Sequence, residues 1–174
     1  SEALLAFTMP PRGGSGQPTQ ANASYRTVSP DYFSAMGIRL AEGRLLTDQD
    51  TVSSLPAIVV NRTLARRYLD GRAVGARLPI VLEENRTQWE IVGVVDDVRM
   101  GGVDDPVQPE IYASYAQRSG VGSTVPSIVV RTTGDPAALI PQVRAAVREL
   151  DASLALDRVA TMEQRLLGNL AAPR

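Results

Sequence analysis

Four aspartates in one short stretch are the densest group of potential ligands in the sequence. Asp96, Asp97, Asp104 and Asp105 stand on either side of a pair of glycines. Carboxylate oxygens in such a loop are the ligands that calcium prefers, and paired carboxylates are also the acid and base of glycosidases. The spacing does not follow the alternating ligand positions of an EF-hand, and acidic pairs are common in surface loops. We therefore predict a solvated turn with no metal bound.

Three glycines near the N-terminus have the composition of a phosphate-binding loop. Gly13, Gly14 and Gly16 are followed by no lysine, and the pattern after them predicts no helix. Both features are needed for a loop that holds phosphate groups at a helix N-terminus. We predict a flexible linker here.

A local group of arginines forms a basic cluster in the sequence. Arg62, Arg66, Arg67 and Arg72 lie on or just after a predicted helix, and such a group is able to contact lipid headgroups or an acidic partner. Aspartates close by in the sequence offset its charge, so we predict a solvated outer helix face.

The composition removes most catalytic chemistry. The 174 residues include 18 arginines and 19 acidic residues, with a net charge of -1 and no lysine, histidine or cysteine. The usual zinc ligands, Schiff-base lysines and imidazole bases are therefore missing, and the weak overall field makes nucleic acid an unsuitable partner. We predict that the chain is not an enzyme, and we assign no catalytic, cofactor-binding or metal-binding residue and no cofactor. No run reaches the roughly 20 apolar residues of a membrane span.

Local patterns in the first 56 residues predict short elements. Residues 4–7 suit a short strand, and residues 10–23, rich in Pro, Gly, Ser and Gln, are typical of a loop. A strand is predicted around Tyr25. Ser29 then provides an N-cap for a helix over residues 30–36 that begins with proline and ends at Gly37.

The middle of the chain begins with an apolar run at residues 57–60, which predicts a buried strand. Asn61 is placed to cap a helix that Asp70 and Gly71 end. Trp89 precedes an apolar strand and is expected to anchor the core, and Gly93 is expected where strands crowd together. The further predictions are strands at 77–82, 89–95 and 110–115, a polar hairpin connection at 83–86 and a loop at 96–109.

The last third predicts an alternation of strands and helices. A strand is expected at residues 127–133, and Asp135 followed by proline starts a helix whose apolar residues recur at 139, 143, 147 and 150. A second short strand is expected at 154–159. Thr161 and Gln164 form a capping box for a final helix through residue 170. This order predicts an α+β fold with helices on one face of a sheet.

Four longer segments of the sequence match a known pattern. They are YRTVSPDYFSAMGIRLAEGRLLTDQD from residue 25, AIVVNRTLARRYLDGRAVGARL from residue 57, WEIVGVVDDVRMGGVDDPVQPEIYASYAQ from residue 89 and SIVVRTTGDPAALIPQVRAAVRELDASLALDRVATMEQRL from residue 127. In the same order along about 140 residues, these segments resemble the MacB-like periplasmic core domain of ABC transporter permeases of the FtsX and MacB type.

The resemblance implies two subdomains. A porter-like βαβ subdomain would be built from both chain ends, residues 1–56 plus 126–174, and a smaller α/β subdomain, residues 57–125, would be inserted into it. The ending NLAAPR is similar to the segment before a transmembrane helix in the duplicated orphan permeases of this family, so we expect flanking transmembrane helices that this segment does not contain.

The resemblance also implies a function. The segment would lie on the periplasmic side of the bacterial inner membrane and transmit conformational change, driven by a cytoplasmic ABC ATPase, to export or release of a substrate. The full-length permease is expected to be a homodimer and the isolated domain a monomer. A periplasmic adaptor protein is a further partner that the resemblance allows. The alternatives are a free periplasmic module that binds a small ligand between the subdomains and an enzyme that uses Asp96, Asp97 or Asp105.

Overall fold

The computed structural model describes residues 3–9, 17–82, 88–99, 106–117, 127–154 and 156–165. Contacts between residues group the chain into two compact units, a first unit of residues 1–99 and 106–129 and a second unit of residues 100–105 and 130–174. The predicted hairpin connection at 83–86, the three N-terminal glycines, Asp104 and Asp105 lie outside the described residues.

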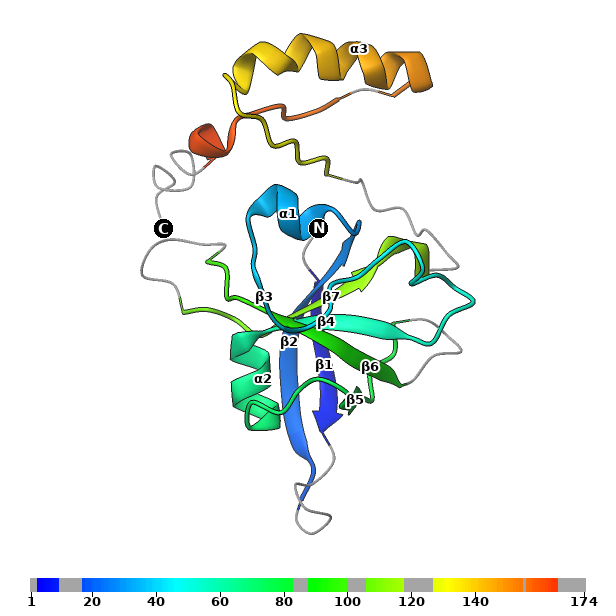
Figure 1. Ribbon diagram of the computed structural model, residues 1–174, viewed down its shortest axis with the longest axis vertical. Coiled ribbons are helices and arrows are strands. Elements are labelled where there is room, and N and C mark those ends of the chain that lie inside the picture. Colours follow the sequence, from blue (N-terminus) through cyan, green and yellow to red (C-terminus); the bar gives the residue numbers. More distant parts are fainter. Residues whose placement is uncertain are drawn as a thin grey trace. The chain divides into compact units, whose positions relative to one another are not determined.

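One mixed sheet organises the first unit (Figure 1). Its strand order is β1 (Ala3–Met9), β2 (Thr19–Val28), β7 (Glu110–Ser114), β4 (Ala57–Asn61), β6 (Trp89–Val95) and β3 (Leu40–Gly43), and β5 (Arg77–Leu78) also pairs with β6. Pairing is parallel between β2 and β7 and between β4 and β6, and antiparallel between the other neighbours. The sheet thus joins strands that are far apart in the sequence.

The hairpin of β1 and β2 is longer than the sequence predicts. We expected a loop from residue 10 to residue 23, but β2 begins at Thr19, and its residues 19–25 pair with all of β1. Ala21 and Ala23 are buried, and Phe7 lies opposite Ala21 in the register. Small apolar side chains on alternate positions are enough to fix one face of this strand to the core, which the polar composition of the segment conceals.

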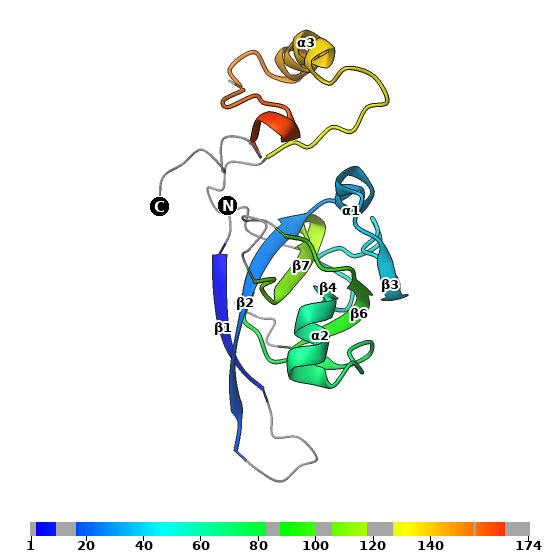
Figure 2. The same cartoon turned by 90° about the vertical axis from the view of Figure 1, so that its left-hand side faces the viewer.

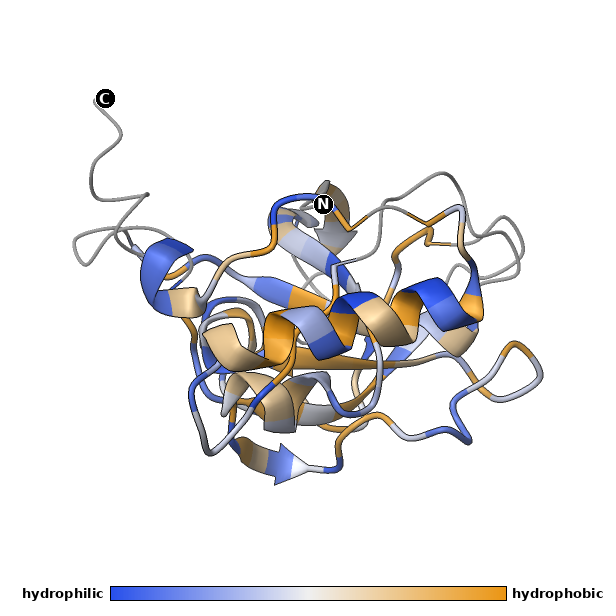
Figure 3. Ribbon diagram, turned by 90° about the horizontal axis from the view of Figure 1, so that it is seen from above, coloured by the Kyte–Doolittle hydropathy of each residue, from blue (hydrophilic) through white to orange (hydrophobic). Residues whose placement is uncertain are grey.

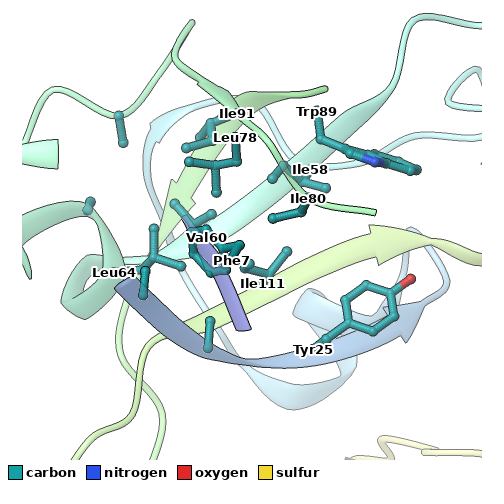
Figure 4. Close-up of a cluster of buried hydrophobic side chains, with 14 of the residues drawn as sticks. Phe7, Tyr25, Ile58, Val60, Leu64, Leu78, Ile80, Trp89, Ile91 and Ile111 are labelled. Atoms are coloured by element: carbon teal, nitrogen blue, oxygen red, sulfur yellow. The ribbon is translucent and has the colours of Figure 1, made fainter. Parts of the chain in front are cut away.

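One face of the sheet carries the larger core cluster, shown in Figure 4. Ile58 and Val60 of β4 point to this face and pack with Leu64 of α2 (Arg62–Leu69). Trp89 is fully buried in the same cluster, as predicted for a core anchor. The other buried side chains labelled in Figure 4 are Phe7, Tyr25, Leu78, Ile80, Ile91 and Ile111.

The opposite face carries a second core cluster. Val59 of β4 packs there with Phe33 of α1 (Tyr32–Met36) and with Tyr112 of β7. The rings of Phe33 and Tyr112 meet edge to face, with their centroids 5.2 Å apart. Because both faces of β4 are covered, all five of its residues are buried, which explains its unbroken apolar run.

Helix ends follow the predicted capping chemistry in most places. Asn61 caps α2, and Asp70 ends it in the left-handed conformation with φ of 51°. Gly37 ends α1 with φ of 70°. The predicted start of α1 is wrong by two residues: its N-cap is Asp31 without a side-chain hydrogen bond, and the carbonyl of Ser29 instead accepts from the N–H of Tyr32. Pro30 therefore belongs to a turn before the helix.

Close approach of two strands explains the predicted role of Gly93. A Cβ atom at Gly93 would lie 2.0 Å from the carbonyl oxygen of Arg44, and a Cβ atom at Gly43 would lie 2.2 Å from that of Val92. Side chains at these positions would force β3 and β6 apart. The predicted strand at 77–82 is confirmed only at β5, since residues 79–82 form no ladder.

The second unit is built around α3 (Ile140–Leu150), which follows the 3₁₀ turn η3 (Ala137–Leu139). Asp135 accepts from the N–H of Ala137, but the predicted helix start is wrong: Pro136 is the N-cap of η3, and α3 begins only at Ile140 without a side-chain cap. Figure 3 colours α3 in alternating hydrophobic and hydrophilic bands, in line with the apolar spacing of the sequence. The predicted capping box is confirmed, because Thr161 and Gln164 exchange side-chain to backbone hydrogen bonds of 2.9 and 3.2 Å.

The two strands predicted in this part of the sequence are wrong. Residues 127–133 and the described residues of 154–159 belong to no ladder. The apolar side chains of residues 128–130 are among the exposed ones, so β-branched composition alone does not make a strand without a neighbour to pair with. None of the described helices has both the length and the apolar character needed to cross a membrane.

The α+β class is confirmed by the mixed sheet and its few helices. The predicted division into residues 1–56 plus 126–174 and residues 57–125 stays a prediction. Contacts in this structure group the residues differently, because the sheet takes β2 from the first predicted part and β7 and β4 from the second.

Candidate functional site

Asp97 holds the N-terminus of α2. Its carboxylate accepts from the backbone N–H of Thr63 at 2.8 Å and from the hydroxyl of Thr63 at 2.9 Å. Arg66, one turn further along α2, donates to the same carboxylate at 3.0 Å. A negative charge at this position satisfies a free N–H group and lies at the positive end of the helix dipole.

Asp96 is bound by two arginines. Arg62 donates to one carboxylate oxygen at 2.7 Å and Arg39 to the other at 3.1 Å. The hydrogen bond from Arg62 lowers the pKa of Asp96 below its usual value, and the charge of Arg39 adds to this effect. Arg39 precedes β3 and Arg62 begins α2, so the carboxylate joins elements on two sides of β6. We call Arg39, Arg62, Arg66, Asp96 and Asp97 the arginine–aspartate cluster.

The arginine–aspartate cluster adds ion pairs to two predicted surface features. Arg62 and Arg66 are exposed, as predicted for an outer helix face, but each donates to a carboxylate of Asp96 or Asp97. A carboxylate that already accepts from guanidinium groups makes a poor calcium ligand. Among the residues that the structure describes, no group of three or more acidic, histidine or cysteine side chains is placed to hold a metal ion.

Asn61 joins α2 to the start of β7. Its side-chain oxygen accepts from the N–H groups of Leu64 and Glu110, both at 3.0 Å, and its amide donates to the carbonyl of Gln108 at 2.8 Å. The Asn61 residue has no exposed surface. One buried amide therefore fixes the helix N-terminus and the chain that enters β7, while Asp97 fixes the chain that leaves β6.

A buried polar cluster that the sequence did not point to lies on β2 and β7. Glu110 is buried, and its carboxylate accepts hydrogen bonds from Arg26, at 3.3 Å, and from the hydroxyl of Tyr112. Burial and the neighbouring Glu110 carboxylate raise the pKa of Tyr112 above its usual value. Burial also raises the pKa of Tyr32, whose ring is near that of Tyr112. Both tyrosines therefore stay neutral, and Tyr112 remains a hydrogen-bond donor.

Asp50 and Arg44 close the loop between β3 and β4. Their two hydrogen bonds are both 2.8 Å, and Asp50 also accepts from the N–H of Thr47 at 2.8 Å. Burial of Asp50 would raise its pKa, but the hydrogen bonds from Arg44 and Thr47 outweigh burial and hold the pKa below its usual value. This pair again serves structure, since both carboxylate oxygens are engaged.

The remaining candidates show no built site. The guanidinium of Arg67 lies 5.6 Å from the ring centroid of Tyr68, and Arg72 is exposed. In the second unit a hollow is lined by Arg144, Arg148, Leu154 and Leu156. Both of its arginines are exposed, so the hollow presents no buried polar group that would orient a ligand.

The sequence profile of the MacB-like periplasmic core domain family matches residues 5–150. That range includes the whole sheet apart from the first residues of β1, all of α1 and α2, and α3. This chain belongs to that family.

Individual relatives agree with the family assignment. The macrolide export ATP-binding/permease protein MacB of Aggregatibacter actinomycetemcomitans is 24% identical over 123 residues, which are 69% of this chain and 18% of MacB. The crystal structure of the periplasmic region of MacB from Actinobacillus actinomycetemcomitans superposes with a TM-score of 0.57 at 15% identity, covering 86% of this chain and 64% of that one. At such identity the second match supports the fold alone.

The family gives the wider context of these contacts. MacB-like periplasmic core domains are parts of ABC transporter permeases, which work with an ATPase. The side chains that the fold brings together here are arginine–carboxylate pairs and one buried amide, which hold loops against a sheet. The chain spans less than a fifth of the length of its MacB relative, so the activity of a whole transporter is a matter for proposal.

Proposed function

We propose that this chain is the extracytoplasmic domain of an ABC transporter permease that transmits conformational change, driven by a cytoplasmic ATPase, to export or release of a substrate outside the inner membrane. The observation that carries the proposal is the family match over residues 5–150. The whole permease is proposed to act as a homodimer, with its membrane helices beside this domain. The chain itself has no catalytic role in this proposal.

The contacts of the first unit support a role in transmission. A domain that passes on a movement has to keep its own shape while its outer contacts change. Asp97 and Asn61 both fix chain segments to α2, and the Arg44–Asp50 pair fixes the loop before β4. These bonds join loops to a sheet whose central strand is buried on both faces. Displacement of one loop would therefore move the unit as a body.

Cysteine labelling of the full-length gene product tests the location. This segment contains no cysteine, and Arg72 is exposed after α2, so Arg72→Cys creates a defined reporter. In whole cells with a permeabilised outer membrane, a membrane-impermeant maleimide should label this variant above the level of the unsubstituted protein. Val59→Cys is the matched control, because Val59 is fully buried. Labelling of Arg72→Cys only after cell lysis would overturn the proposed location.

The same approach tests transmission. The Leu55 residue is 78% exposed before β4, and Leu55→Cys reports on contacts of this surface. We expect its labelling rate, or that of Arg72→Cys, to differ between the nucleotide-free permease–ATPase complex and the complex trapped with ATP and vanadate. Equal rates in both states at every exposed reporter of the segment would contradict a domain that changes its contacts with ATP hydrolysis.

A further inference from the structure

The two edge strands of the sheet differ in the features that prevent pairing with another strand. In the strand order of the described sheet, β3 lies at one end and β1 at the other. β3 has four residues, includes Glu42 and has a register shift between Leu40 and Glu42. Shortness, charge and irregular register each weaken an edge as a template for another strand.

β1 has none of these features. Its seven residues, ALLAFTM, contain no charged side chain and no proline, and its register with β2 has no irregularity along its whole length. Figure 2 shows β1 at the margin of the sheet, beside β2. A long, regular, uncharged edge presents a row of backbone donors and acceptors that another strand would satisfy.

The side chains of β1 alternate in a way that suits pairing with itself. Leu4, Ala6 and Thr8 are exposed on one face, while Phe7 is buried on the other and Leu5 packs against the core cluster. Antiparallel pairing of two β1 strands centred on Ala6 places Leu5 of each copy opposite Phe7 of the other. On the exposed face, Leu4 lies opposite Thr8 and the two small Ala6 side chains meet.

We propose that the outer edge of β1 pairs antiparallel with β1 of a second copy of this chain, centred on Ala6, to give one continuous sheet. The core-side contact of Leu5 with Phe7 extends the apolar layer from one copy into the next. Because β1 is uncharged, no like charges oppose each other in the paired state. The inference goes beyond the proposed transport role, which would stand if the pairing failed, and it departs from the expectation that the isolated domain is a monomer.

Disulfide trapping tests both the pairing and its register. The chain has no cysteine of its own, so each introduced cysteine is the only thiol. In the proposed register the two Ala6 Cα atoms lie about 4.5–5.5 Å apart, within the range of a disulfide. The two Thr8 Cα atoms would be separated by four residue steps along the strands, about 13 Å, which is too far.

We expect Ala6→Cys to form disulfide-linked dimers about tenfold faster than Thr8→Cys under the same mild oxidation, because both sites are exposed but only the first lies on the symmetry axis. A mixture of Leu4→Cys and Thr8→Cys should form the mixed disulfide in preference to either homodimer. Ala6→Asp, which places two negative charges together, should reduce the dimer fraction seen by sedimentation of the otherwise unaltered chain.

Three outcomes would overturn the proposal. These are equal cross-linking rates for Ala6→Cys and Thr8→Cys, no preference for the mixed disulfide, or a sedimentation profile that Ala6→Asp leaves unchanged. Circular dichroism of each variant establishes that it is folded. If Ala6→Cys does not fold, the mixture of the Leu4 and Thr8 variants decides the question, because neither alters the central residue.

Discussion

Replacement of Asn61 by alanine should destabilise the first unit more than loss of an ordinary helix cap. Loss of the cap to Leu64 costs about 1 kcal/mol. The substitution also leaves the buried N–H of Glu110 without its acceptor, which costs about 1–3 kcal/mol, and it removes the bond to Gln108, which contributes about 1 kcal/mol. The expected loss in the free energy of unfolding is therefore about 3–5 kcal/mol.

Urea unfolding followed by tryptophan fluorescence measures this loss. Trp89 is the single tryptophan and is fully buried in the first unit, so its emission reports on that unit. With a denaturant slope of about 2 kcal/mol per molar, Asn61→Ala should lower the urea midpoint by roughly 2 M. The slope itself should not change, because the same surface is exposed on unfolding.

Two further variants divide the effect into its parts. Asn61→Ser keeps an oxygen able to cap α2 but lacks the amide that reaches Gln108, so it should lose about half as much stability. Gln20→Ala removes an exposed hydrogen bond to Thr8 in the same unit and should change stability by no more than about 0.5 kcal/mol. If Asn61→Ala were no more destabilising than Gln20→Ala, the argument that one buried amide joins α2 to β7 would be refuted.

Three other substitutions, one of them with a matched glycine control, test other contacts of the first unit. Asp50→Asn should lower the free energy of unfolding by about 1–3 kcal/mol near neutral pH. Folding lowers the pKa of Asp50, so the ionised carboxylate stabilises the fold above the unfolded pKa of about 3.9. This stabilisation is lost as the pH falls through the pKa of the folded state. Urea titrations at several pH values should show the variant approaching the parent in acid, and a gap that stays constant would contradict this. Gly93→Ala should lower the free energy of unfolding by about 3 kcal/mol or more, because its Cβ would meet a backbone oxygen. Gly71 has φ of 77° and open space around it, so Gly71→Ala should lower the free energy of unfolding by only about 1 kcal/mol. Similar thermal midpoints for the two variants would argue against close contact of β3 and β6. Asp97→Ala should weaken the start of α2 by about 1–2 kcal/mol, visible as faster amide hydrogen exchange in the first turn, and unchanged exchange there would show that the carboxylate does not hold the helix.

Local chemistry predicted many elements because it depends on residues close together in the sequence. Asn61 caps the N–H three residues later, Gly37 ends α1 in a conformation that glycine adopts at low cost, and Thr161 bonds to Gln164 within one turn. The buried run of β4 was equally clear. Each of these signals needs no knowledge of the rest of the fold.

The site could not be predicted in the same way. The partners of Asp96 include Arg39, which is 57 positions away, and Glu110 meets Arg26 across 84 positions. Only the strand order brings these residues together, and no local pattern encodes that order. Residues 127–132 show the converse, because their β-branched composition is that of a strand while the described sheet gives them no neighbour.

The position of β7 between β2 and β4 has a consequence for synthesis. When the ribosome has made this segment as far as about residue 100, the β1–β2 hairpin and the parallel β4–β6 pair are available but have no strand in common. The two sets of strands therefore each keep an open edge until residues 110–114 leave the ribosome, form β7 and pair with both β2 and β4. Non-local pairing of this kind is slow, and open edges expose a nascent chain to aggregation. A chain delivered from its N-terminus would complete this fold late, and the interval before β7 arrives is when a chaperone would bind it with most effect.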